Sequence, residues 1–399
     1  MTRYFLLFTA LLFIAACDGG NGNDNDVDTI VTCEHDGITY PVGAMITIAC
    51  NLCTCIYDGS FVCDALYCDD DIAQTDQTDL PDSSDTTPTD TDFPDDTIDD
   101  ALIVDTDTVI ECIDGTIDDG DCGYPNGKQI RNCVDGKWGE WSECLDINKA
   151  VIDITAASTC ADYYWADRGD APLAYTTGMG LVFAGAFCHI DRSDVATVAA
   201  AKTTDTEHDA LAWYEEIFAD LSMDNSVDGA DTLRHAYTLL LGLGMRESSG
   251  EHCCGRDQSA DNVTADTAEA GLFQTSYNSH NFSDELDTLY AHWKILYNMA
   301  FPVACLLDIF SEDVYCSAAD WENYGTGEGV IFQEMEKSCP TFAAEYAAFM
   351  LRVSGGSLGH YGPLRRHEAE VRPECDAMFG EIQALIEANP YYCRFLPNY

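Results

Sequence analysis

Positive charge is scarce in this chain of 399 residues, which has 18 Lys and Arg residues against 71 Asp and Glu residues and a formal net charge of -53. Because clusters of Lys and Arg bind the phosphate backbone, we expect no nucleic-acid partner. After the first residues, no apolar run is long enough for a transmembrane helix. The sequence lacks a phosphate-binding glycine loop, an HExxH zinc helix and a Ser-His-Asp signature, so we expect neither a cofactor nor a metal ion.

Cysteine, by contrast, is abundant. The 20 cysteines indicate an oxidising compartment, since a reducing cytosol would keep so many thiols unpaired and reactive. Hydrophobic residues make up 46% of the chain, which is enough to bury at least one large core. A length of 399 residues exceeds that of one typical domain, so we predict a multidomain protein with unevenly distributed acidic residues.

Residues 1–16 have the pattern of a signal peptide. Arg3 precedes an apolar run over residues 4–13, and the small residues Ala15 and Ala16 precede Cys17. This pattern resembles a bacterial lipoprotein signal, which implies that Cys17 becomes the lipidated first residue. Its acyl chains would hold the protein on a membrane of the bacterial cell envelope, at the outer membrane or at a periplasmic or extracellular face. The alternatives are an ordinary secretory signal and a membrane helix, for which the apolar run is short.

A flexible tether over residues 17–32 leads to a first cysteine module over residues 33–68. So short a segment cannot bury enough apolar surface to fold alone, and its six cysteines predict three disulfides, with a zinc site as the alternative. The CNLCTC run and Gly59 resemble von Willebrand factor type C and pacifastin-like modules, which implies a small β module. We interpret it as a spacer or as a module that binds an envelope protein or glycan. Its cysteines are Cys33, Cys50, Cys53, Cys55, Cys63 and Cys68.

An acidic segment separates this module from a second one. Residues 69–108 contain fifteen Asp and nine Thr but no Lys or Arg, so self-repulsion predicts a disordered, extended linker over residues 69–111. Residues 112–144 are similar to a thrombospondin type 1 repeat in their KWGEWSEC sequence. The similarity implies a small disulfide-linked β module in which Arg131 stacks between Trp138 and Trp141. The cysteines of this second module are Cys112, Cys122, Cys133 and Cys144.

Residues 145–399 have the composition of a globular domain. Apolar residues recur at spacings of three and four in six segments, while alternating strand patterns are few, so we predict a mainly α domain. Asp231 is the expected N-cap of the second helix, and Pro340 and Gly355 are expected to separate later helices. The predicted helices cover residues 205–223, 230–246, 285–299, 329–337, 341–353 and 366–387.

The strongest candidates for catalysis lie in residues 242–280. The apolar sequence LLLGLGM is followed by Glu247, so a carboxyl group stands where a packed helix meets a loop. Partial burial raises the pKa of such a carboxyl, which can then hold a proton and transfer it to a leaving oxygen. Further on, Gly271 would let the backbone approach a ligand, and the Gln274 amide can hydrogen-bond a sugar. The alternative for Glu247 is a helix-end carboxylate with no catalytic task.

The sequences GMRESSG and AGLFQTS resemble the catalytic motifs of the lysozyme and lytic transglycosylase superfamily. The resemblance implies a lysozyme-like helical domain in which Glu247 is the catalytic acid. The stretch between the two motifs is longer than is usual in transglycosylases and contains two adjacent cysteines, so the shape of the groove departs from the pattern. By the same resemblance, the residues of the catalytic motif and substrate groove are Ser248, Ser249, Gly271, Leu272, Phe273 and Gln274.

Two further features concern the same site. The resemblance makes Tyr361, in the sequence GHYGP, a candidate for positioning an N-acetyl group near Glu247, with loop packing as the alternative. A second carboxylate would decide the mechanism, because inverting enzymes need a base and retaining ones a nucleophile. No motif distinguishes the acidic residues of the intervening loop, and the likeness to lytic transglycosylases implies chemistry with Glu247 alone. The loop residues are Asp257, Asp261, Asp266 and Glu269.

The domain contains nine cysteines, including Cys253 and Cys254 beside His252. In an oxidising compartment they are better explained by disulfides than by a metal site. Because nine is an odd number, we expect one cysteine to be free or to pair outside the domain.

These patterns lead to two hypotheses of function. The first is an envelope-anchored enzyme that cleaves β-1,4 bonds of peptidoglycan or a related N-acetylated glycan, as a lytic transglycosylase or a lysozyme-type muramidase. The second is a non-catalytic surface lipoprotein that binds glycan or protein through its disulfide modules and lysozyme-like domain. The motif around Glu247 favours the enzyme, whereas the net charge of -53 counts against it because peptidoglycan is itself anionic.

Overall fold

A computed structural model describes residues 111–123, 126–190, 194–256, 264–298 and 302–396, together with five short strands between residues 32 and 63. The predicted signal peptide, the lipidation site Cys17 and nearly all of the predicted tether and acidic linker lie outside these residues. Among the described helices, none is both long and apolar enough to cross a membrane.

Contacts divide the chain into two units, one of residues Leu66–Asp146 and one of Met1–Ala65 with Ile147–Tyr399. In the first cysteine module, β1 pairs with β2, and β3, β4 and β5 form an antiparallel sheet in that order. The disulfides predicted for this module lie outside the described residues. The strands are β1 Thr32–His35, β2 Ile38–Pro41, β3 Met45–Ile48, β4 Asn51–Cys55 and β5 Phe61–Cys63.

The second cysteine module is an antiparallel sheet of β6 Ile117–Asp121, β7 Lys128–Val134 and β8 Lys137–Trp138. The disulfides Cys112–Cys133 and Cys122–Cys144 close it. The predicted stacking is confirmed, because the Arg131 guanidinium carbon lies 4.9 Å from the ring centre of Trp138 and 4.4 Å from that of Trp141. Arg131 also forms an ion pair with Asp118 at 2.6 Å, so its side chain is committed to holding the module together.

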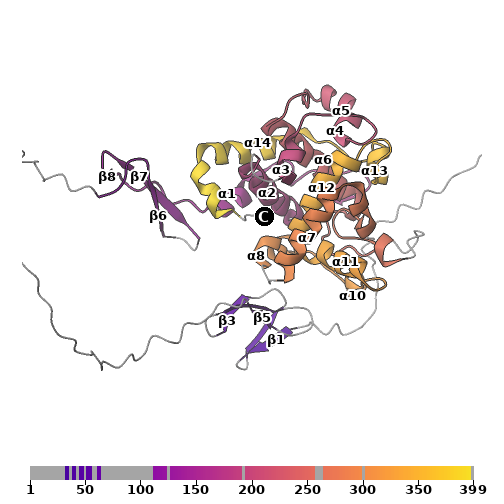
Figure 1. Cartoon of the computed structure of the whole chain (residues 1–399), viewed down its shortest axis with the longest axis horizontal. Helices are drawn as coiled ribbons and strands as arrows, with labels where there is room; N and C mark the ends of the chain where they lie inside the picture. The colour runs from indigo at the N-terminus through magenta and orange to yellow at the C-terminus, as the bar shows by residue number, and fades with distance from the viewer. Residues whose placement is uncertain are drawn as a thin grey trace, which may run out of the picture. The chain divides into compact units, whose positions relative to one another are not determined.

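The C-terminal domain is mainly helical, as predicted (Figure 1). Its few strands form two short hairpins, β9 Tyr164–Trp165 with β10 Gly169–Asp170, and β11 Glu269–Ala270 with β12 Thr275–Ser276. Short 3-10 helices cover η1 Ala265–Thr267, η2 Tyr277–Phe282 and η3 Pro390–Phe395. The described α-helices are α1 Ile147–Ala157, α2 Leu173–Cys188, α3 Asp194–Ala200, α4 Ala210–Trp213, α5 Glu215–Asp220, α6 Ala230–Ser248, α7 Asp284–Asn298, α8 Pro302–Cys305, α9 Leu307–Phe310, α10 Ala318–Trp321, α11 Glu328–Ser338, α12 Pro340–Ser354, α13 Gly362–Arg365 and α14 Pro373–Ala388.

The core of this domain surrounds α12, which contacts α2, α3, α6, α7 and α11. Both α2 and α6 are buried over most of their length. Two glycines let neighbours approach α2, since a Cβ at Gly178 would overlap Phe310 and one at Gly180 would overlap Thr155. Because α2 is apolar or small on every face, it has no amphipathic period, and periodicity alone does not predict it.

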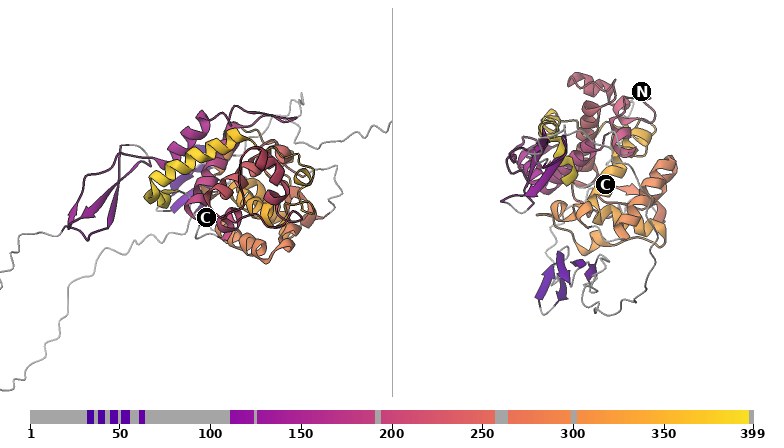
Figure 2. Two further views of the ribbon diagram at one scale, coloured as in Figure 1. Left: turned by 90° about the horizontal axis from the view of Figure 1, so that it is seen from above. Right: turned by 60° about the vertical axis from the view of Figure 1, so that its left-hand side comes forward.

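Disulfides join the two ends of the domain. Cys160–Cys375 and Cys188–Cys393 link positions 215 and 205 residues apart. Next to them, α14 packs against α1 and α2, and Figure 2 shows this yellow helix beside the magenta helices. The other described pairs are Cys253–Cys316 and Cys305–Cys339. Cys254 is disulfide-bonded as well, so none of the nine cysteines of this domain is free.

Four of the six predicted helices are present with similar bounds, as α6, α7, α11 and α12. The predicted helix 205–223 is instead the two short helices α4 and α5, because the Asp209 side chain caps α4 by accepting a hydrogen bond from the Leu211 N–H at 2.9 Å. The predicted start of the helix over residues 366–387 is also wrong. The observed helix, α14, begins at Pro373, because the residue before a proline avoids the helical conformation and Arg372 is extended.

The prediction of Asp231 as the N-cap of α6 is wrong. Gly229 occupies the cap position without a side-chain hydrogen bond, and Asp231 lies in the first turn. Its carboxylate forms an ion pair with Arg234 at 2.6 Å, a local partner that competes with the backbone for the same oxygen.

Candidate active site

Glu247 lies in the last turn of α6, where the helix leaves the core. The preceding residues Leu243 and Met245 are buried. Ser249 ends the helix in a left-handed conformation with a φ of 57°, and its N–H donates to the Met245 carbonyl oxygen at 3.1 Å. Gly250 continues the turn with a φ of 80°. The helix therefore ends one residue after Glu247. The Glu247 side chain is half-buried.

The surroundings raise the pKa of the Glu247 carboxyl to about 8. Loss of hydration is the largest cause, and the negative charge of Glu269 adds to it. The positive charges of Arg168, Arg366 and Arg246 oppose this rise without cancelling it. Within the described part of the chain, no group donates a hydrogen bond to this carboxyl. Glu247 can therefore hold a proton at neutral pH and transfer it to a bound ligand.

The predicted groove residues form the turn of the β11–β12 hairpin. Glu269 pairs with Ser276 and Ala270 with Thr275, so residues 271–274 connect the two strands. Gly271 has a φ of 74°, and a Cβ at this position would overlap the backbone of Glu336 in α11. Glycine is thus required for both its conformation and its lack of a side chain.

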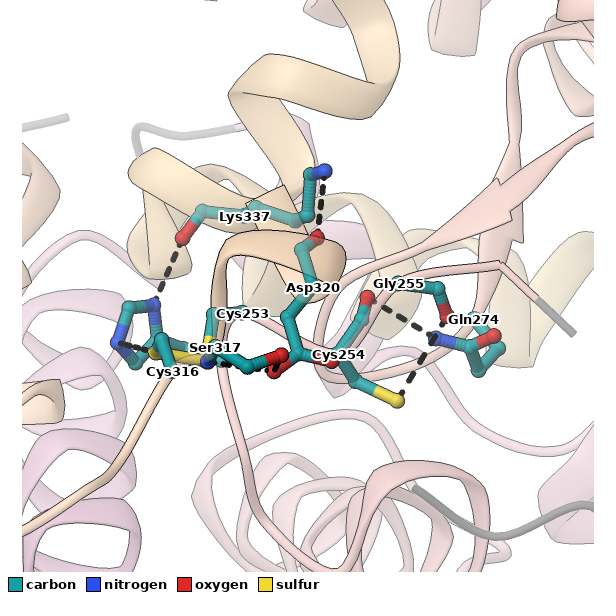
Figure 3. The surroundings of a disulfide bond; sticks show 9 residues. Cys253, Cys254, Gly255, Gln274, Cys316, Ser317, Asp320 and Lys337 are labelled. Atoms are coloured by element: carbon teal, nitrogen blue, oxygen red, sulfur yellow. Dashed lines mark hydrogen bonds between the residues drawn. A yellow bond between two sulfur atoms is a disulfide. The ribbon is translucent and has the colours of Figure 1, made fainter. Parts of the chain in front are cut away.

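The amide of Gln274 fastens this turn to the chain that follows α6. Its Nε2 donates to the carbonyl oxygens of Cys254 at 3.4 Å and Gly271 at 3.1 Å. The Gly271 N–H donates to the same Cys254 oxygen at 2.9 Å, and Figure 3 shows Gln274 next to Cys254. In this arrangement the Gln274 amide donates to the protein backbone, and its contact with a sugar stays a prediction.

Three of the predicted site residues join the hairpin to α6 by packing. The Ser248 hydroxyl donates to the Leu272 carbonyl oxygen at 2.8 Å and is fully buried. Leu272 and Phe273 are also fully buried, and Phe273 lies where a Cβ on Gly244 would crowd it. These contacts set the position of the hairpin relative to Glu247. Direct contact of these side chains with a substrate stays a prediction.

Tyr361 approaches the same site from the start of α13. Its ring is buried, and its hydroxyl lies 3.1 Å from the Thr275 hydroxyl on β12. Burial raises the pKa of Tyr361 well above its usual value, and the charges of Glu336 and Glu247 act in the same direction. The structure therefore brings Tyr361, the hairpin and the end of α6 together from distant parts of the sequence.

Three arginines of this site are not marked by any sequence motif. Arg168 comes from the turn between β9 and β10, Arg246 precedes Glu247 on α6, and Arg366 follows α13. Arg366 forms an ion pair with Glu368 at 2.8 Å, and Arg246 lies 3.7 Å from the same carboxylate. The whole chain has only 18 Lys and Arg residues, so each arginine near Glu247 could have been examined individually as a candidate site residue.

One of the four loop carboxylates, Glu269, raises the pKa of Glu247 through its negative charge. Glu269 precedes the hairpin turn, and its charge is the second cause of the raised Glu247 pKa. Asp266 is exposed on η1. Asp257 and Asp261 lie outside the described residues. Of the two that the structure describes, Glu269 is therefore the stronger candidate for a second carboxylate.

The ligand atoms of His252, Cys253 and Cys316 lie within 4.8 Å of one another, which is the geometry of a small metal-binding group. The sulfurs of Cys253 and Cys316 form a disulfide, which leaves them without the thiolate charge that metals bind (Figure 3). The His252 Nδ1 donates to the Lys337 carbonyl oxygen at 2.8 Å, and the Lys337 ammonium donates to the Asp320 carbonyl oxygen at 2.8 Å. The cluster therefore joins α10 and α11 to the segment that follows α6.

Comparisons of the chain with protein-family models, with curated proteins and with solved structures find no match. The function proposed below therefore rests on the residues and their geometry.

Proposed function

We propose that this protein is an envelope-anchored enzyme that cleaves β-1,4 bonds of peptidoglycan or a related N-acetylated glycan, with Glu247 as the general acid. The observation that carries the proposal is the state of the Glu247 carboxyl. It is desolvated, its pKa is raised to about 8, and it accepts no hydrogen bond from the described residues. Such a carboxyl is protonated at neutral pH and has an unused donor for a leaving oxygen.

The reaction follows from that proton. Glu247 transfers it to the oxygen of the glycosidic bond, the bond between this oxygen and the anomeric carbon breaks, and the electron pair leaves with the oxygen. The positive anomeric carbon is then attacked by water or by the 6-hydroxyl of the same sugar. The Glu247 carboxylate takes up the proton released in this second step. Attack by water leaves a reducing end, whereas attack by the hydroxyl leaves an anhydro sugar.

The surroundings of Glu247 support a glycan as the substrate. The half-buried Glu stands at a helix end beside a hairpin with a tight glycine turn, which agrees with the lysozyme-like arrangement that the sequence resemblance implies. Tyr361 contacts the hairpin through its hydroxyl, which lies 3.1 Å from that of Thr275. Its role in positioning the N-acetyl group of the bound sugar stays a prediction.

The remaining parts of the chain would keep this enzyme at the envelope. A diacylglyceryl group on Cys17 would provide the anchor, and the acidic linker would give the C-terminal domain reach across the cell wall. Six described disulfides agree with an oxidising compartment. The two small modules are candidates for binding an envelope protein or glycan.

Mass spectrometry of the products from purified peptidoglycan tests the proposal. The full chain with its disulfides formed is compared with Glu247→Gln, which keeps the shape of the side chain but removes its proton transfer. We expect soluble muropeptides from the wild type, a loss of at least about 100-fold in Glu247→Gln, and no loss in the control Glu381→Gln on the exposed face of α14.

The type of product then decides the reaction. Anhydro ends from the wild type identify a lytic transglycosylase, and reducing ends identify a hydrolase. If neither protein releases products from peptidoglycan or from chitin oligomers, the enzyme proposal is wrong, and the non-catalytic binding lipoprotein replaces it.

A further inference from the structure

Arg168 stands out among the charged residues around Glu247. It lies in the turn between β9 and β10 and is half-buried. Its Nη2 donates to the carbonyl oxygen of Arg246, the residue before Glu247. Its Nε is buried without a hydrogen-bond partner, and no carboxylate of the described residues forms an ion pair with it. This guanidinium therefore carries donors that the protein itself does not use.

Two comparable arginines of the same domain are paired with carboxylates. Arg352 is buried and lies 2.9 Å from Asp209, and the half-buried Arg234 lies 2.7 Å from Asp376. The chain has 71 Asp and Glu residues, so carboxylates that could pair with an arginine are abundant. Because a desolvated charge without a partner costs folding free energy, its retention at one position calls for a reason outside the folded chain.

The position of Arg168 supplies that reason. Its charge acts on the Glu247 carboxyl, and its own pKa is lowered by loss of hydration and by the nearby guanidinium of Arg246. Arg246 lies 3.9 Å from Asp167 and 3.7 Å from Glu368, so its charge is partly offset, whereas Arg168 forms no ion pair among the described residues. An anion bound there would relieve the repulsion between the two guanidinium groups.

We propose that Arg168 binds a carboxylate on the sugar next to the cleaved bond, so that the preferred substrate is an acidic β-1,4-glycan. This inference rests on the proposed function of Glu247. The planar guanidinium suits a carboxylate because it can donate two parallel hydrogen bonds. The same interaction would draw an anionic glycan to the site of a protein whose net charge of -53 otherwise repels it.

Two kinds of sugar carry such a carboxylate. In N-acetylmuramic acid the lactyl group ends in a free carboxylate when no peptide is attached, and in a uronic acid the carboxylate is part of the sugar itself. A peptide on the lactyl group converts the carboxylate to a neutral amide. If muramic acid is the source, an amidase-type reaction that removes the peptide must therefore supply this substrate.

Equilibrium binding to the full chain carrying Glu247→Gln, which prevents turnover, tests this proposal. The probes are four tetrasaccharides: N-acetylglucosamine with peptide-free muramic acid, the same strand with peptides, N-acetylglucosamine with glucuronic acid, and the neutral chitin tetramer. We expect one or both of the acidic probes to bind about 10- to 100-fold more tightly than the chitin tetramer. The acidic probe that binds more tightly identifies the source of the carboxylate.

Variants of Arg168 are then made in the same background. Arg168→Gln is expected to abolish the preference for acidic probes while leaving chitin binding unchanged, and Arg168→Lys to retain part of it through its charge. Lys149→Gln is the comparison, because Lys149 is an exposed cation on α1 that pairs with Asp153 outside the site. Equal binding of acidic and neutral probes, or an equal loss of preference in Lys149→Gln, overturns the assignment to Arg168.

The two proposals fail in different ways. If wild-type protein cleaves peptidoglycan but shows no preference for acidic probes, the enzyme stands and the Arg168 site is wrong. If the preference depends on Arg168 but no glycan is cleaved, the carboxylate site stands and the enzyme is wrong.

Discussion

At the scale of single residues, Glu247 shows how one carboxyl is given an unusual proton affinity. Three arginines act to keep it charged, yet the loss of hydration and the charge of Glu269 outweigh them. The outcome depends on burial at the end of α6, where the side chain is half-covered and accepts no hydrogen bond from the described residues. A group held in this way is prepared for proton transfer at a cost to the stability of the fold.

That cost leads to a prediction for Glu247→Gln as a function of pH. The native carboxyl has a pKa of about 8 and the unfolded one a pKa near 4.5, so between these values the native state binds a proton that the unfolded state releases. The free energy of unfolding of the wild type therefore falls as pH rises through this window. Glutamine does not titrate, so the variant should become more stable than the wild type from pH 5 to pH 8.

Thermal denaturation at several pH values measures this difference. The control is Glu381→Gln on the exposed side of α14, whose difference from the wild type should not grow in this way. A melting-temperature difference for Glu247→Gln that stays constant from pH 5 to pH 8 would contradict a raised pKa at this position.

At the scale of secondary-structure elements, the hairpin β11–β12 is held in place by contacts from three directions. Ser248 bonds it to α6, the backbone of Glu336 in α11 closes on Gly271, and Tyr361 at the start of α13 contacts Thr275. The hairpin is short, and two strands of two residues are not stable alone. Its position, and that of Glu269 within it, therefore depends on these neighbours.

Gly271→Ala tests this dependence. The substitution meets a positive φ of 74°, which costs about 1 kcal/mol, and adds a methyl group where the Glu336 backbone leaves no space. We expect a total loss of stability of about 2 to 4 kcal/mol, together with reduced glycan cleavage. The measurement is denaturant-induced unfolding.

Gly169→Ala is the matched control for this experiment. Gly169 at the start of β10 has a φ of 82° and open space around the added Cβ, so only the conformational cost of about 1 kcal/mol applies. Equal losses in the two variants would show that the contact between the hairpin and α11 contributes nothing.

At the scale of the whole molecule, long-range disulfides close the C-terminal domain. Cys160–Cys375 joins the chain between α1 and α2 to α14 over 215 residues, whereas Cys305–Cys339 spans 34. A cross-link removes more conformational freedom from the unfolded chain when the loop that it closes is longer. The first disulfide should therefore stabilise the domain more than the second.

Replacing both cysteines of each pair by serine tests this order. The loss of chain entropy predicts destabilisation of about 5 kcal/mol for the longer loop and about 4 kcal/mol for the shorter one. Unfolding by denaturant under non-reducing conditions measures both. A larger effect for the Cys305–Cys339 pair would mean that local strain or packing, and not loop length, determines the contribution.

The membrane anchor is a prediction for the full chain in a bacterial cell. Cys17→Ala removes the thiol that would carry the diacylglyceryl group, so we expect the protein to move from the membrane fraction to the soluble fraction. Mass spectrometry of the N-terminal peptide of the wild type should show the added lipid. Equal membrane association of both proteins would contradict the lipoprotein prediction and leave the secretory signal or membrane helix.

Several features could be predicted because they depend on residues close in the sequence. The spacing of apolar residues at three and four positions predicts α6, α7, α11 and α12, because this period is local to each helix. The stacking of Arg131 on two tryptophans was implied by a short motif and is confirmed. Glu247 could be singled out because an apolar helix leads directly to it, and burial of its carboxyl follows from that context.

Tertiary structure decided the rest. No local period marks α2, because a helix buried on every side has no polar face, and only its packed neighbours stabilise it. Arg168 precedes Glu247 by 79 positions, so no spacing rule connects them, and only the fold brings its guanidinium to the carbonyl oxygen of Arg246, the residue before Glu247. The sequence by itself determined which groups can carry charge or a proton. Folding decided which of them lose water and which partners they meet, because desolvation and Coulomb energies depend on distances in space.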